Sequence, residues 1–305
     1  MSNRHWCPGV VALVIVLGLI AAPAGAQTLD APRCGTGVHE SEATGTVGFP
    51  EDQIFCPLIA DPKEARSFVS YLHGTFRSLD DPSGKGTSIA SVGVGDTFGL
   101  FRVGGPDPGE GIQLDVMGGI FAQFDLGTTS NDLINADYIV GFPLTFRRHG
   151  FSFRAKLYHQ SSHLGDEYLL RSDEIVRENL SFESIEFLVS QELSVLRLYV
   201  GAEKIFRREP DELPDSLFHT GVEVRSGRAR KVQMLAGVDV KTTERHDWSP
   251  AVSGRVGLEL GRPGPEGHPG RLIMLLFEMY QGPSPYGQFF QDDISYLGAS
   301  VHIGL

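Results

Sequence analysis

Hydrophobic and polar residues alternate with a period of two through most of the chain after its first 66 residues. Within 112–124, Ile112 and Leu114 share one face, whereas Gln113 and Asp115 share the other. Such alternation is typical of β-strands with one apolar face. Turn residues interrupt it at short intervals, and the pattern predicts twelve antiparallel strands, or ten without the first two. The predicted strands are about 67–78, 87–103, 111–124, 135–148, 151–162, 180–193, 195–208, 217–226, 230–242, 250–261, 271–281 and 294–305.

Strand length and charge placement predict the class of fold. Strands in soluble sandwiches usually have ~5–6 residues, whereas membrane-spanning strands need ~9–11. Charged residues recur in mid-strand on one parity only, and lipid does not tolerate them at its midplane. We therefore predict an all-β fold, a transmembrane antiparallel β-barrel with a polar, filled interior; a secreted sandwich or lipocalin-like barrel is the alternative. The inward-facing charges are Asp115, Arg154, Lys156, Glu186, Arg197, Glu203, Asp239, Arg255 and Glu259.

The beginning of the chain predicts export. Arg4, the apolar run Val10–Ala22 and the A-G-A box at 24–26 indicate a cleaved signal peptide over 1–26 rather than an uncleaved anchor. Residues 27–66 show no periodicity and are expected to form an irregular periplasmic N-terminal segment before a barrel domain over 67–305. We expect the protein in the bacterial outer membrane.

Connections between the predicted strands alternate in length. The turns at His149–Gly150 and near Ser194 are tight, whereas 163–179 and 282–293 are long. Outer-membrane barrels have short periplasmic turns and longer outer loops, so both termini are predicted to be periplasmic. Pro143 lies inside a predicted strand, where it removes a hydrogen bond and predicts a β-bulge.

Net charge limits the possible binding partners, and cysteine content bears on disulfide formation. The net charge of -12 argues against a nucleic-acid partner, because binding phosphate needs a basic surface. Membrane lipid and lipopolysaccharide are the expected partners, and the oligomeric state stays open. Cys34 and Cys56 remain after removal of the signal and are predicted to form a disulfide in an oxidising periplasm, with two free thiols as the alternative.

His159 and Ser161 provide the candidate chemistry. Both continue the apolar parity of strand 151–162, so they are predicted to face lipid near its outer end. Residues two apart on one face lie ~6.5–7 Å apart, a gap that an imidazole can bridge. A serine becomes a nucleophile when an adjacent base takes its proton, and that base needs a third group to orient it. The alternative is a polar pair that contacts lipid headgroups.

The orienting group is expected on the next strand, 180–193. Symmetric pairing about the loop places Glu183 opposite His159, with Asn179 further out; the two are alternative orienters. In the loop between, Asp166 and Glu167 offer carboxylates that could hold Ca²⁺. A solvated acidic loop is the alternative, and no other cofactor is expected.

The strand YHQS at 158–161 resembles the active-site strand of the outer membrane phospholipase A family, and lipid A deacylases carry a similar His-x-Ser. This resemblance implies a twelve-stranded barrel with His159 as base, Ser161 as nucleophile and Asn179 as orienter. The chain departs from the phospholipase pattern at Ser162 and His163.

A wider resemblance involves an uncharacterised family of outer-membrane-type barrels, DUF1207, which implies the fold and no activity. Two hypotheses follow for function: a lipid acyl-ester hydrolase, or a non-catalytic barrel that is structural, a narrow pore or a partner of surface polysaccharide. The segments that carry the resemblance are 55–68, 114–126, 136–147, 158–168 and 284–290.

Overall fold

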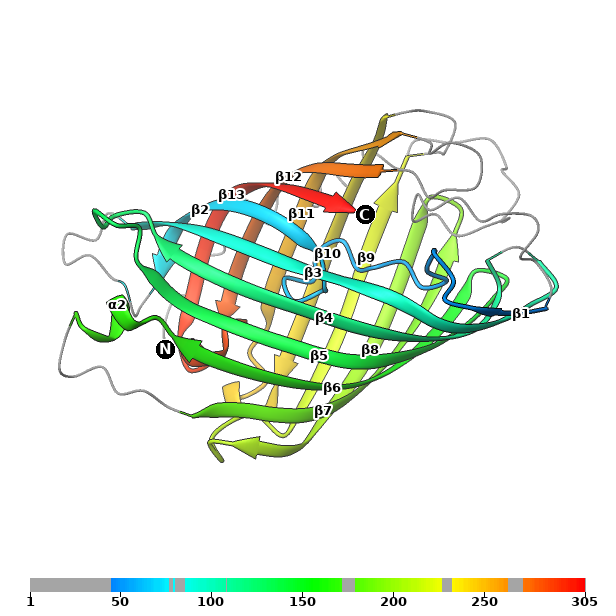
Figure 1. The fold of residues 1–305 in the computed structure, drawn as a ribbon. Coiled ribbons are helices and arrows are strands. Elements are labelled where there is room, and N and C mark those ends of the chain that lie inside the picture. Colours follow the sequence, from blue (N-terminus) through cyan, green and yellow to red (C-terminus); the bar gives the residue numbers. More distant parts are fainter. Residues whose placement is uncertain are drawn as a thin grey trace.

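The computed structural model describes residues 45–76, 79, 86–107, 109–171, 179–226, 232–262 and 271–304. Within this part of the chain, one antiparallel sheet contains β1–β13, and pairing of β3 with β4 closes β2–β13 into a twelve-stranded barrel (Figure 1). The strands are β1 (Gly45–Gly48), β2 (Ser67–Phe76), β3 (Thr87–Gly104), β4 (Gly111–Asp125), β5 (Leu133–Arg148), β6 (Phe151–Leu164), β7 (Leu180–Leu193), β8 (Leu196–Glu209), β9 (Ser216–Arg225), β10 (Val232–Thr243), β11 (Ala251–Arg262), β12 (Arg271–Pro283) and β13 (Asp293–Gly304).

The predicted barrel is confirmed, and every predicted strand end lies within two residues of the observed one. The faces are also as predicted. On β5, Val140, Phe142 and Leu144 are 49%, 51% and 45% exposed, whereas the residues between them are buried. An apolar outer face of this kind matches the lipid-facing surface of membrane barrels.

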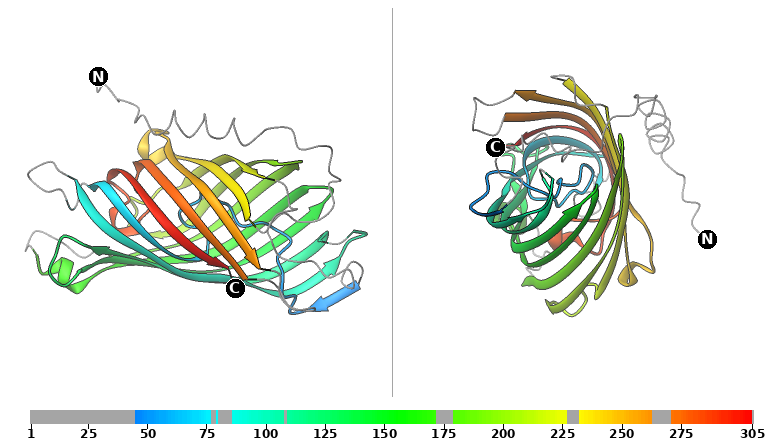
Figure 2. Two further views of the ribbon diagram at one scale, coloured as in Figure 1. Left: turned by 90° about the horizontal axis from the view of Figure 1, so that it is seen from above. Right: turned by 90° about the vertical axis from the view of Figure 1, so that its right-hand side faces the viewer.

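Residues 50–66, here called the plug, run through the interior of the barrel. Ile54, Leu58 and Ile59 are completely buried. The wall binds the backbone of this irregular segment: Arg197 Nη1 donates to Cys56 O at 2.8 Å, and Arg255 Nη1 donates to Ile59 O at 3.1 Å. In the end-on view of Figure 2, the blue segment lies within the ring of strands.

The plug differs in location from the sequence-based expectation of a periplasmic segment over 27–66. The polar wall accounts for this location, because buried guanidinium groups such as those of Arg197 and Arg255 have more donors than the wall carboxylates accept, and carbonyl groups of the plug accept the others. The predicted signal peptide, 1–26, and Cys34 lie outside the described residues. Cys56 is disulfide-bonded.

Ion pairs between wall strands and between wall and plug fill the interior, as predicted. Arg154 lies at their centre, since its guanidinium contacts Glu186 of the wall at 3.0 Å and Glu64 of the plug at 2.8 Å. Further pairs are Lys156–Glu186 at 3.0 Å, Arg225–Glu259 at 2.6 Å, Arg255–Glu278 at 3.1 Å, Lys241–Asp61 at 2.8 Å and Arg102–Asp52 at 2.7 Å.

The bulge predicted at Pro143 is wrong. The β4–β5 ladder pairs Leu114 with Leu144 and resumes at Met117 with Gly141, so the register is the same on both sides of the interruption. Proline removes one donor, and the strand tolerates the loss without an extra residue. The shift in this pairing lies instead between Gln123 and Phe124. Among the described residues, no helix has the length and apolarity needed to cross a membrane.

Candidate functional site

His159 and Glu183 form the centre of a polar site on the outer face of the barrel. Alternation on β6 and β7 turns both side chains outward, and the observed register pairs His159 with Glu183 and Ser161 with Ser181. This is the register expected from symmetric pairing about the β6–β7 loop.

The imidazole and the carboxylate are in direct contact. His159 Nδ1 lies 3.2 Å from Glu183 Oε1, and the two side chains are 42% and 27% exposed. When Nδ1 carries the proton and donates it to this hydrogen bond, Nε2 keeps a free lone pair and can act as a base. The pair therefore has the arrangement of a base held by an orienting acid.

Ser161 lies on the same face, two residues further along β6 and partly buried. Within the described residues, no hydrogen bond joins it to His159, so proton transfer between them requires a side-chain rearrangement that brings the hydroxyl and the imidazole together. Asn179 is exposed and lies just before β7, one position beyond the Ser162–Leu180 pair. Of the two alternative orienters, Glu183 is the one in contact with His159.

Arg207 on β8 extends the site and was not predicted from the sequence. Its Nη1 lies 3.5 Å from Glu183 Oε1, and its side chain is 80% exposed. A register shift between Glu183 and Ser184 changes the pairing, so that Glu183 faces Arg207 while Ser184 faces Ile205. The shift interrupts strict alternation, which is why parity did not predict an outward Arg207.

On the inner side of the same wall, Asp137 joins four segments. Its carboxylate accepts hydrogen bonds from Ser162 Oγ and from Gly287 N at 3.1 Å, and it pairs with Lys63 of the plug. Gln288 N donates in turn to Ser162 Oγ at 3.1 Å. The β12–β13 loop is thereby connected through β5 and β6 to the plug, and all four segments are among those that carry the DUF1207 resemblance.

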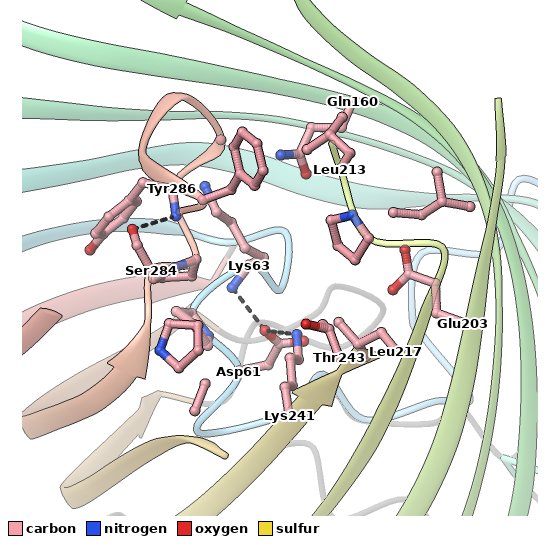
Figure 3. A pocket seen from close by; sticks show the side chains of 18 of the residues that line it. Asp61, Lys63, Gln160, Glu203, Leu213, Leu217, Lys241, Thr243, Ser284 and Tyr286 are labelled. Atoms are coloured by element: carbon pink, nitrogen blue, oxygen red, sulfur yellow. Dashed lines mark hydrogen bonds and ion pairs between the residues drawn. The ribbon is translucent and has the colours of Figure 1, made fainter. Parts of the chain in front are cut away.

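A cavity of about 170 Å³ lies between the plug and the loops at this end of the barrel. Figure 3 shows Asp61 between Lys63 and Lys241, with Tyr286 and Leu213 toward the top of the view. Burial alone would raise the pKa of the Asp61 carboxyl, but Lys241 holds that pKa below its ordinary value. The cavity is lined mainly by apolar side chains, with charged groups such as Asp61 and Lys241 in one part of its wall, and its volume can accommodate several waters or a small solute.

The predicted calcium ligands Asp166 and Glu167 begin the short helix α2 (Asp166–Leu169), and both are exposed. Within the described residues, neither gathers with other candidate ligands into a group of three. Calcium binding in this loop stays a prediction.

Comparisons with known proteins support the fold. Outer membrane phospholipase A from Escherichia coli has a TM-score of 0.50 and 12% identity over 79% of this chain and 90% of its own. An active-site mutant of that enzyme has a TM-score of 0.51 and 11% identity over 84% of this chain and 94% of its own. At such identities the likeness shows a shared barrel fold.

No curated protein sequence matches the chain. A family model does match: it covers residues 22–305 and is described as "Protein of unknown function (DUF1207)". The chain, an outer-membrane-type β-barrel, belongs to this family.

Proposed function

We propose that this protein is an outer-membrane hydrolase of lipid acyl esters, with Ser161 as nucleophile, His159 as base and Glu183 as orienter. The observation that carries the proposal is the 3.2 Å contact between His159 Nδ1 and Glu183 Oε1 on the outward face, beside a serine. An ester bond of an outer-leaflet lipid is the substrate that such a position can reach.

The reaction would proceed through an acyl-enzyme. Ser161 Oγ attacks the ester carbonyl carbon while its proton passes to His159 Nε2, and Glu183 stabilises the imidazolium that forms. The imidazolium then gives this proton to the departing alcohol oxygen. Water, deprotonated by His159, attacks the acyl-serine; fatty acid leaves and Ser161 regains its proton.

The filled interior of the barrel argues against one of the alternative functions, a pore. The plug closes the lumen with completely buried side chains such as Leu58 and Ile59, so a narrow pore has less support than a hydrolase or a structural barrel. A non-catalytic role in contacting lipid or lipopolysaccharide remains the alternative to be excluded by experiment.

Fatty-acid release from phospholipid or lipid A, measured on barrels refolded into vesicles, tests the proposal. Ser161→Ala should lower release by roughly 10³-fold or more, because loss of a nucleophile removes the covalent route. Ser181→Ala is the matched control, since Ser181 pairs with Ser161 on the neighbouring strand. Release that survives in Ser161→Ala would exclude the serine mechanism.

The orienter has a separate test. Glu183→Gln should lower release on the order of 10²–10⁴-fold, since an amide no longer stabilises the required tautomer and imidazolium. Asn179→Ala should leave release unchanged, because Asn179 is exposed and lies beyond His159. If Asn179→Ala lowered release and Glu183→Gln did not, the orienting role would belong to Asn179.

A further inference from the structure

Three potential metal ligands meet at the end of the barrel that carries the tight turns. Asp107 and Glu110 belong to the β3–β4 turn, and His149 belongs to the β5–β6 turn. One ligand atom from each lies within 4.8 Å of the other two. The two turns are neighbours because Gly111, which begins β4, pairs with Arg147 near the end of β5.

Glu110 is the buried member of this group, with 8% of its surface exposed. Its Oε1 accepts a hydrogen bond from His149 N at 2.6 Å, which holds the carboxylate beside the second turn. Its Oε2 is buried and, within the described residues, has no hydrogen-bond partner. A buried carboxylate oxygen without a partner is unfavourable unless a cation or donor satisfies it.

We propose that Asp107, Glu110 and His149 bind a divalent transition-metal cation of the Zn²⁺ type. One imidazole nitrogen and two carboxylate oxygens suit a borderline ion, whereas Ca²⁺ and Mg²⁺ prefer oxygen ligands throughout. Three protein ligands leave room for water in the remaining position. The bound ion cross-links the β3–β4 and β5–β6 turns and satisfies Glu110 Oε2.

This site is independent of the proposed hydrolase. His149 precedes β6, whereas His159 and Ser161 lie toward the other end of that strand. A variant that loses the metal should therefore keep its acyl-ester activity if that activity exists, and the metal site stands if it does not.

The conformation of the β5–β6 turn allows His149 to be replaced conservatively. His149 has φ 49° and Gly150 has φ 76°, the positive values of a type I′ hairpin turn. Asparagine is favoured at the first position of such a turn. His149→Asn therefore removes the imidazole while preserving the backbone conformation and the N–H that donates a hydrogen bond to Glu110. Glu110→Gln removes the charge at nearly constant volume.

Titration of the full-length, refolded barrel with ZnCl₂ tests the proposal. Wild type should bind one ion per barrel at this site, and His149→Asn and Glu110→Gln should each weaken binding roughly tenfold or more, because even groups that only support a ligand commonly contribute that much. His163→Asn is the matched control at the opposite end of β6 and should bind as wild type does.

Co²⁺ gives a second readout. Its visible absorption should change on binding to wild type and to His163→Asn, and not in His149→Asn. Circular dichroism and heat-modifiable migration establish that each variant is folded. Absence of binding to folded wild type, or equal binding by wild type and both site variants, would overturn the proposal.

Discussion

Replacement of Phe55 by alanine should loosen the plug. Phe55 is 5% exposed, and its ring lies between two wall guanidinium groups, 4.4 Å from Arg154 Cζ and 4.6 Å from Arg197 Cζ. Removing a buried phenylalanine side chain costs about 3–5 kcal/mol, and each cation–π contact contributes roughly 0.5–2 kcal/mol of it. At about 1.4 kcal/mol per tenfold, the displaced state of the plug should become about 10²–10⁴-fold more populated.

Amide hydrogen exchange of the reconstituted barrel measures this population directly. In Phe55→Ala, the protection of the amides of residues 54–60 against exchange should fall by about 10²–10⁴-fold. The protection of the strand amides should not change. Phe55→Leu should have a smaller effect, because it keeps most of the volume and loses only the ring. Phe142→Ala, which truncates a lipid-facing ring that is 51% exposed, is the control. Equal protection of the plug in Phe55→Ala and Phe142→Ala would refute the assignment of Phe55 as an anchor.

Three further predictions concern named contacts. Because the pKa of Asp61 is lowered in the folded protein, its contribution is present above the ordinary value of 3.8 and is lost as the pH falls below it. Plug protection in wild type should therefore begin to decrease below about pH 5 and continue to fall at lower pH, and Asp61→Asn should reduce that dependence, to which Glu64 beside Arg154 also contributes, while weakening the plug at neutral pH. Asp137→Asn should increase exchange at both Lys63 and Gly287, since one carboxylate binds both segments; a change confined to one of them would contradict this coupling. Arg207→Gln should alter the free energy of unfolding by no more than about 0.5 kcal/mol, because its ion pair is solvent-exposed, and should lower acyl release less than Glu183→Gln does.

Alternation allowed most of the barrel wall to be predicted from sequence. A period of two determines both the strand and its two faces, so the bounds of β4 or β5 and the inward position of Arg154 follow from the same pattern. The pairing of His159 with Glu183 was also predictable, because a hairpin that is symmetric about its loop has one register.

Alternation along the chain could predict neither the plug nor Arg207. Residues 50–66 have no periodicity, and their location depends on partners such as Arg197 and Arg255 that are distant in sequence. The apolar run IFCPLIA at 54–60, in an otherwise polar segment, was a usable signal that these residues are buried. Arg207 was missed because the register shift at Glu183–Ser184 arises from pairing between strands, which alternation within one strand does not reveal.

The most direct measurement of the proposed activity is labelling of the nucleophile with a lipid-like fluorophosphonate, located by peptide mass spectrometry in the refolded barrel. We predict one adduct, on Ser161, that is lost in His159→Asn and strongly reduced in Glu183→Gln, while Ser181 stays unlabelled. An adduct on another serine, or no adduct on folded wild type under conditions that label a known serine esterase, would contradict it.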